Sequence, residues 1–168
     1  MQEFIVLERI IGIDIGLRNT GYGILDFGQN TEKIVEGGVI KTDSKKNLDE
    51  RLLTIFKDLD YVYKKYNPSI TSMEDLHSRY RNLKTAIIMG HARGVACAVA
   101  SLNNAPVFHY QPTQIKNIVT GSGRADKNQV IKTISNRLSS PSIKNEHVAD
   151  AFASAICHWV MSSSNKKV

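Results

Sequence analysis

Cysteine is scarce in this sequence, and its two copies stand far apart. Among the 168 residues only Cys97 and Cys157 occur, each alone within an apolar pattern of helical spacing. Two isolated cysteines make neither a disulfide framework nor a zinc cluster. We therefore expect two small, buried side chains in a protein of a reducing compartment, the cytoplasm.

Long hydrophobic runs are lacking as well. The longest weakly polar stretch, residues 94–107, is interrupted by Ser, Asn and Pro and is too short to span a bilayer. The first eleven residues carry Glu3 and Glu8, and they lack the basic start and small-residue cleavage site of a secretory signal. The sequence thus predicts a protein that is neither exported nor embedded in a membrane.

Acidic residues are nearly missing from one half of the chain. Between positions 77 and 144, ten Lys or Arg residues stand against one acid, Asp126, within an overall net charge of +6. A face of one charge sign suits a polyanion, because each neutralised phosphate releases counterions. On charge alone, a nucleic-acid surface and a merely solvated basic surface remain equally open.

The order of the expected elements predicts an α/β fold. Three β-rich runs come first, over residues 9–15, 21–27 and 33–41. They favour an antiparallel meander, and a helix over 48–66 and a short buried strand over 69–74 follow. The later elements are a helix at 82–102, a strand at 107–110, and helices at 113–120, 127–138 and 144–161. We expect one domain over 1–161, a mixed sheet with helices on both faces, and a flexible tail over 162–168.

Asp14 is the first candidate for chemistry. In Ile11-Gly12-Ile13-Asp14-Ile15-Gly16 the isoleucines share one face of a strand, and the glycines share the other face with the carboxylate. Aspartate is depleted in strands, and a buried carboxylate is costly unless it is paired or metal-bound. For an isolated aspartate, capping by local backbone near the strand end is the competing explanation.

Two later segments supply further candidates. Glu74 closes a strand, at the end where ligands of open α/β sheets usually bind. His147 and Asp150 are three residues apart and share one face of the last helix. Taken singly, each could be an exposed charge or part of a surface pair. Together with Asp14, they suit a hard cation such as Mg²⁺ or Mn²⁺, and a pair of such ions can promote phosphodiester hydrolysis.

An ordered series of motifs over residues 9–160 resembles the RuvC family of Holliday junction resolvases, within the RNase H-like superfamily. The series consists of Gly12-Ile-Asp-Ile-Gly16, Thr20-Gly-Tyr-Gly23, Glu74-Asp-Leu76, Gly90-His-Ala-Arg-Gly-Val95, Pro106-Val-Phe108, Gln114-Ile-Lys116, Gly121-Ser-Gly-Arg-Ala-Asp-Lys127 and His147-Val-Ala-Asp-Ala151. The resemblance implies an RNase H-like fold with a five-stranded mixed sheet whose first three strands are antiparallel. It also implies a homodimeric endonuclease that nicks two opposed strands of a four-way DNA junction during recombination and repair, with a branch-migration complex as a partner.

The resemblance also assigns roles to residues. The catalytic metal ligands map onto Asp14, Glu74, His147 and Asp150, with two Mg²⁺ ions per active site that Mn²⁺ can replace. Lys116 and Lys127 match basic positions near the scissile phosphate. The other expected DNA contacts are His77, Arg79, Tyr80, Arg81, Lys84 and Arg124. This chain departs from the usual pattern at His147, where many relatives carry Asp, and at His77, where an aromatic side chain usually stacks on a base.

The helix expected at 82–102 carries a groove of small residues. Ala86, Gly90, Gly94 and Ala98 recur every four positions along one face. Such a groove permits close approach of another backbone, which could be the protein's own sheet. In the family that the motifs resemble, this region helps to form the dimer interface.

Three other functions compete with this interpretation. An actin-like or sugar-kinase-like ATPase also starts with Gly-x-Asp-x-Gly, but it needs two lobes and a second Asp-x-Gly segment, which this sequence lacks. A junction-binding protein whose site has lost activity through His147 is the second. The third is a nuclease of the same fold that cuts another substrate, such as RNA in hybrids.

Overall fold

The computed structural model describes residues 7–29, 31–75 and 82–165, which form five strands and five helices. In chain order these are β1 (Glu8–Asp14), β2 (Asn19–Phe27), β3 (Glu32–Lys41), α1 (Leu48–Tyr66), β4 (Ile70–Glu74), α2 (Leu83–Leu102), β5 (Val107–Tyr110), α3 (Pro112–Thr120), α4 (Lys127–Arg137) and α5 (Glu146–Asn165). Every expected element is present, and nearly all ends agree within two residues. The largest difference is at α5, which continues to Asn165, so residues 162–165 of the expected tail are helical.

The five strands form one mixed sheet in the order β3-β2-β1-β4-β5. β2 is antiparallel to both β1 and β3, whereas β4 is parallel to β1 and β5 is parallel to β4. The predicted antiparallel meander of the first three strands is therefore confirmed. Because β1, β4 and β5 run the same way, their C-terminal ends meet at one edge of the sheet.

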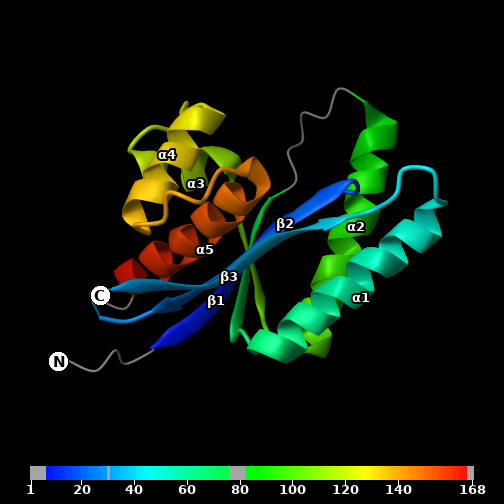
Figure 1. Ribbon diagram of the computed structural model, residues 1–168, viewed down its shortest axis with the longest axis horizontal. Helices are drawn as coiled ribbons and strands as arrows, with labels where there is room; N and C mark the ends of the chain where they lie inside the picture. The colour runs from blue at the N-terminus through cyan, green and yellow to red at the C-terminus, as the bar shows by residue number, and fades with distance from the viewer. Residues whose placement is uncertain (1–6, 30, 76–81, 166–168) are drawn as a thin grey trace.

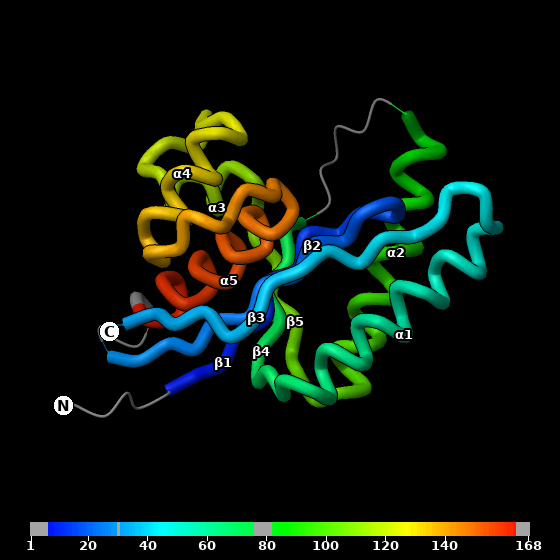
Figure 2. Tube along the Cα trace, in the orientation of Figure 1, coloured from blue at the N-terminus to red at the C-terminus, as the bar shows by residue number. Residues whose placement is uncertain are grey.

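Helices cover both faces of the sheet, as predicted. α1 and α2 lie on one side and α3, α4 and α5 on the other (Figures 1 and 2). Ile11 and Ile13 are buried in the core under α1 and α2. Gly12 and Asp14 alternate with them and face α5. The period-two pattern at the C-terminal end of β1 thus places the isoleucines on one face and the carboxylate of Asp14 on the other.

Glycines allow α5 to lie very close to β1 and β2. A Cβ atom on Gly12 would be 1.8 Å from the carbonyl oxygen of Ala151. A Cβ atom on Gly21 would be 2.2 Å from the carbonyl oxygen of His147. Real Cβ atoms do not approach so closely, so only glycine permits this separation. The strand glycines therefore set how near the first turns of α5 come to the end of β1.

Helix α2 buries only one side. Its buried residues are Ala92, Ala96, Val99 and Ala100. Its other side exposes Leu83, Ile87 and Leu102. A Cβ atom on Gly90 or Gly94 would meet nothing within 4 Å, so the small-residue groove does not face the protein's own sheet, and that alternative is wrong. Among the described residues, α2 is also the one helix whose length and apolar composition would suit a membrane span.

The two cysteines lie apart, as expected. Cys157 is buried, Cys97 is half-buried, and both are free thiols. Burial raises the pKa of Cys157 to about 11, so its thiol stays protonated at neutral pH. Both therefore act as small apolar side chains within the two cores.

Candidate active site

Asp14 is the last residue of β1, opposite Gly21 of β2. Its side chain is 26% exposed. Burial raises the pKa of its carboxyl group, and the hydrogen bond with His147 opposes that rise. A carboxyl group whose pKa is shifted by burial at the end of a central strand is a candidate for chemistry.

Glu74 lies close to Asp14 because β4 runs parallel to β1. The register pairs Ile13 with Met73, so both carboxylates follow at the same end of their strands. Burial, then the negative charges of Asp14 and Asp150, raises the pKa of Glu74 to about 7. This repulsion among carboxylates is what a bound cation would relieve.

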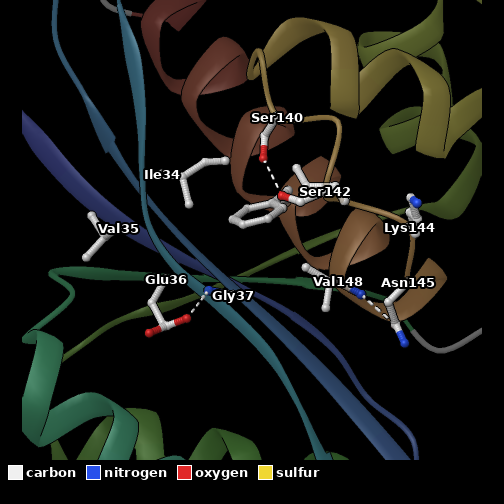
Figure 3. Close-up of a pocket in the computed structure, with 11 residues that line it drawn as sticks. Ile34, Val35, Glu36, Gly37, Ser140, Ser142, Lys144, Asn145 and Val148 are labelled. Atoms are coloured by element: carbon white, nitrogen blue, oxygen red, sulfur yellow. Dashed lines mark hydrogen bonds between the residues drawn. The ribbon is translucent and has the colours of Figure 1, made fainter.

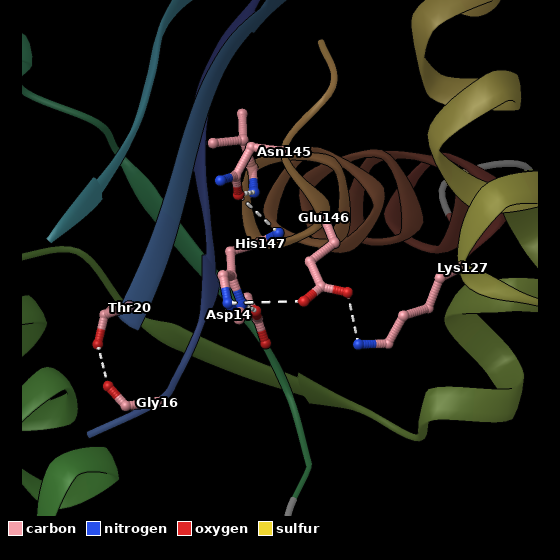
Figure 4. A network of polar contacts seen from close by, with 8 residues as sticks. Asp14, Gly16, Thr20, Lys127, Asn145, Glu146 and His147 are labelled. Atoms are coloured by element: carbon pink, nitrogen blue, oxygen red, sulfur yellow. Dashed lines mark hydrogen bonds and ion pairs between the residues drawn. The ribbon is translucent and has the colours of Figure 1, made fainter. Parts of the chain in front are cut away.

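The first turn of α5 supplies His147 and Asp150. The side chain of Asn145 starts this helix by accepting hydrogen bonds from the backbone N–H groups of His147 (3.0 Å) and Val148 (3.3 Å). The Nδ1 atom of His147 lies 2.7 Å from Oδ2 of Asp14 (Figure 4). Burial, then the charge of Asp14, raises the pKa of Asp150 to about 6. The four residues that the sequence singled out thus lie at one end of the sheet.

Two lysines border these carboxylates. Lys127 opens α4, and its Nζ atom lies 2.5 Å from Oε2 of Glu146 (Figure 4). Its positive charge lowers the pKa of Asp14 and of Asp150 against the effect of burial. Lys116 of α3 acts on Glu74 in the same sense. Both lysines therefore place positive charge close enough to the carboxylates to accompany a phosphate there.

Of the other six expected DNA contacts, the structure describes two. Lys84, in the first turn of α2, and Arg124, in the loop before α4, are both exposed. The remaining four, His77, Arg79, Tyr80 and Arg81, lie outside the described residues.

The donor set suits a hard divalent cation, although its side chains do not form a ready-made cage. Among the described residues, no group of three His, Cys, Asp or Glu side chains is arranged to hold a metal ion. Three carboxylates and an imidazole are nevertheless ligands that Mg²⁺ or Mn²⁺ accepts. Burial, and then the charge of neighbouring carboxylates, raises the pKa values of Glu74 and Asp150, and a bound cation would favour their charged forms. By its chemistry the set therefore fits a metal.

Two charged residues near the site were not recognised from the sequence. Arg93 of α2 donates hydrogen bonds to the backbone carbonyl of Glu74 and to the carboxylate of Asp75. Glu146 pairs with Lys127 and lies 3.9 Å from Nε2 of His147. Each is adjacent in sequence or space to a predicted residue, but only the fold brings them into contact.

A separate hollow lies on the other side of the start of α5. It has a volume of about 320 Å³ and lies between the edge strand β3 and the loop before α5 (Figure 3). Its lining includes the apolar side chains of Ile34, Val148 and Phe152 and, from the loop before α5, Ser142 and Lys144. None of the four candidate catalytic residues lines it. The carboxylate cluster is therefore distinct from this hollow.

Comparison with known proteins settles the family. The family model described as crossover junction endodeoxyribonuclease RuvC matches residues 10–158. The chain belongs to the RuvC family. It is 45% identical over 152 residues to the RuvC of Alkaliphilus oremlandii, a match that covers 89% of this chain and 91% of the relative. It is 40% identical over 158 residues to the RuvC of Caldicellulosiruptor saccharolyticus, covering 93% and 95%.

Solved structures agree with this assignment. A structure described as T. thermophilus RuvC in complex with a Holliday junction substrate superposes with a TM-score of 0.87 at 27% identity, covering 94% of this chain and 96% of that one. The structure of Thermus thermophilus RuvC matches with a TM-score of 0.81 at 26% identity and the same coverage. The predicted RNase H-like fold is thus confirmed. The protein is a crossover junction endodeoxyribonuclease, a hydrolase of a metal-dependent RuvC family.

Proposed function

We propose that this RuvC-family chain works as a cytoplasmic homodimer that binds four-way DNA junctions and nicks two opposed strands with Asp14, Glu74, His147 and Asp150. The observation that carries the site is the meeting of carboxylates from β1, β4 and α5, two of which have pKa values raised to about 7 and about 6. Burial and mutual repulsion of this kind disfavour the charged carboxylates unless a cation compensates them.

These four residues would hold Mg²⁺, two ions per active site, and Mn²⁺ would replace it. The bound cations would activate water and neutralise charge on the phosphodiester. Asp14 contributes in a second way, because its hydrogen bond to Nδ1 of His147 orients the imidazole. That bond leaves Nε2 as the nitrogen for a cation, as in the carboxylate–histidine–metal arrangement. Imidazole is a softer ligand than carboxylate, which favours Mn²⁺ more than an aspartate would.

Substrate binding would rely on the basic side of the cluster. Lys116 and Lys127 support this role, since their charges already act on the carboxylates. On binding, the phosphate would compete with Glu146 for Lys127, which exchanges one ion pair for another. The further DNA contacts in this proposal are His77, Arg79, Tyr80, Arg81, Lys84 and Arg124.

Helix α2 is the surface that we propose for the homodimer. Leu83 is 75% exposed and Leu102 is 61% exposed, at opposite ends of one helix face. Gly90 and Gly94 lie between them, with open space around them. A second copy packed here would bury an apolar stripe that a monomer leaves in water. A branch-migration complex is the further partner in this proposal.

Cleavage of a synthetic four-way junction tests the function. Wild type and Asp14→Asn are incubated with junction and with linear duplex of the same sequence, in Mg²⁺ and separately in Mn²⁺. We expect wild type to nick two opposed strands of the junction and leave the duplex intact, and Asp14→Asn to bind the junction without cutting it. Equal binding with no cutting by either protein in either metal would overturn the proposed site.

A further inference from the structure

Arg93 reaches from α2 to the end of the strand that carries Glu74. Its side chain is only 12% exposed, although the residue lies at the border of a half-exposed helix. One terminal nitrogen donates to the backbone carbonyl oxygen of Glu74. The other lies 3.1 Å from Oδ1 of Asp75 and 2.6 Å from Nδ1 of His109 on β5. One guanidinium therefore joins α2, β4 and β5.

Asp75, one of the residues that Arg93 contacts, is also held by hydrogen bonds to Gln111 and Tyr110. The side chain of Gln111 donates to Oδ2 of Asp75 at 3.1 Å, and the backbone N–H of Asp75 donates to the carbonyl of Tyr110 at 2.8 Å. The C-terminal end of β4 is thus clamped between α2 and the chain that follows β5. These bonds hold the backbone of Glu74 and Asp75 and the carboxylate of Asp75, and they leave the Glu74 carboxylate to interact with Asp14 and Asp150.

We propose that Arg93 is a positioning residue for Glu74. The inference rests on the proposed role of Glu74 as a metal ligand. The last residues of a strand fray easily, and a ligand that moves by an ångström loses much of its effect. A planar guanidinium bridges the three acceptors on Glu74, Asp75 and His109 at once, whereas the ammonium group of a lysine is a compact point charge without that fork of donors. Groups that orient metal ligands typically contribute 10- to 100-fold to metal affinity or activity.

The chain offers a matched control in Arg9. This arginine also joins a carboxylate and a backbone carbonyl, with Nε and Nη2 on Asp26 at 2.6 and 2.8 Å and Nη1 on the carbonyl of Tyr66 at 2.7 Å. It lies near the start of β1, whereas Asp14 lies at the end of that strand. Loss of Arg9 should therefore lower stability in the same way without touching the site.

The test is junction cleavage as a function of Mg²⁺ concentration, with junction binding in EDTA and thermal melting measured on the same samples. We expect Arg93→Gln to raise the half-saturating Mg²⁺ concentration by about 10- to 100-fold and Arg93→Lys to raise it less. Junction binding in EDTA should stay unchanged for both variants. Arg9→Gln should melt earlier and keep the wild-type Mg²⁺ midpoint.

The outcomes separate this inference from the proposed function. Equal shifts of the Mg²⁺ midpoint in Arg93→Gln and Arg9→Gln, or no shift in either, would overturn the role of Arg93. Glu74→Gln is assayed beside them, and if it cleaves like wild type, the proposed site itself fails. If Glu74→Gln is inactive but the Arg93 midpoint is unchanged, only the inference about Arg93 fails. Should Arg93→Gln not fold, Mn²⁺ binding to Arg93→Lys measured by calorimetry decides, and wild-type affinity would overturn the inference.

Discussion

Replacement of Gly21 by alanine should separate folding from catalysis. Gly21 lies opposite Asp14 in the β1–β2 register and under the first turn of α5. An added Cβ atom would lie 2.2 Å from the carbonyl oxygen and 2.8 Å from the Cβ atom of His147. The substitution therefore pushes on the residue that contacts Asp14, and it changes no polar group.

The size of the effect follows from the contact distances. Since real Cβ atoms essentially never come within 3.0 Å of such neighbours, the start of α5 must withdraw by at least about 0.8 Å. Overpacking of this kind typically destabilises a protein by about 1–3 kcal/mol. A misplacement of about 1 Å at reacting groups can lower the rate about 100-fold. We thus expect Gly21→Ala to remain folded, to melt several degrees lower, and to cleave junctions about 100-fold more slowly.

Single-turnover cleavage at saturating Mg²⁺, together with melting curves, measures both effects. Gly38→Ala is the control, because the three atoms nearest to its new Cβ atom all belong to the side chain of Tyr22, at 2.7–2.9 Å, and not to α5. It should lose some stability and keep the wild-type cleavage rate. A folded Gly21→Ala protein that cleaves as fast as wild type would refute the argument that close packing of α5 places His147.

Three further predictions concern charge and assembly. Glu74 and Asp150, with pKa values of about 7 and about 6, must lose their protons to bind metal. The half-saturating Mg²⁺ concentration should therefore rise about tenfold from pH 7 to pH 6, and up to about 100-fold per pH unit below pH 6. A half-saturating Mg²⁺ concentration that does not change with pH would contradict ligation by these groups. Because the raised pKa of Glu74 means that the folded protein disfavours its charged form, metal-free protein should lose stability as pH rises from about 4.5 to about 7. At pH 8 without metal, Glu74→Gln should then melt about 2–4 °C above wild type, which corresponds to about 1 kcal/mol in the free energy of unfolding after allowance for solvent screening. A melting temperature equal to or below that of wild type would contradict this prediction. Gly94→Leu should raise the dissociation constant of the proposed dimer, measured by analytical ultracentrifugation. It should not destabilise the monomer, since a Cβ atom on Gly94 would meet no other atom within 4 Å. A dissociation constant equal to that of wild type would exclude α2 as the interface.

Much of the fold could be predicted because its signals are local. The alternation of Ile11, Gly12, Ile13 and Asp14 is set by the pleat of a strand, and the structure keeps it, with the isoleucines in one core and the carboxylate facing α5. The helix over Leu48–Tyr66 has the bounds that the helical spacing of its apolar residues predicts, and in the structure Asn47 with Glu50 caps its start and Asn67 in the left-handed conformation ends it. The end of α5 was missed, since its last residues are Ser162, Ser163, Ser164 and Asn165, which are residue types that favour caps and turns over helix interiors.

The site could be predicted as a set of residues but not as a geometry. Spacing placed His147 and Asp150 on one helix face, yet only the glycines of β1 and β2 determine how far that face lies from Asp14. The role of Arg93 was hidden for the same reason, because its partners lie 16 to 19 residues away on two other elements. The helical spacing of apolar residues in α2 does not show which side chains at the edge of its buried face reach the end of β4. Contacts of this type arise from how α2, β4 and β5 converge, so residues that support a site are harder to predict from one sequence than residues that form it.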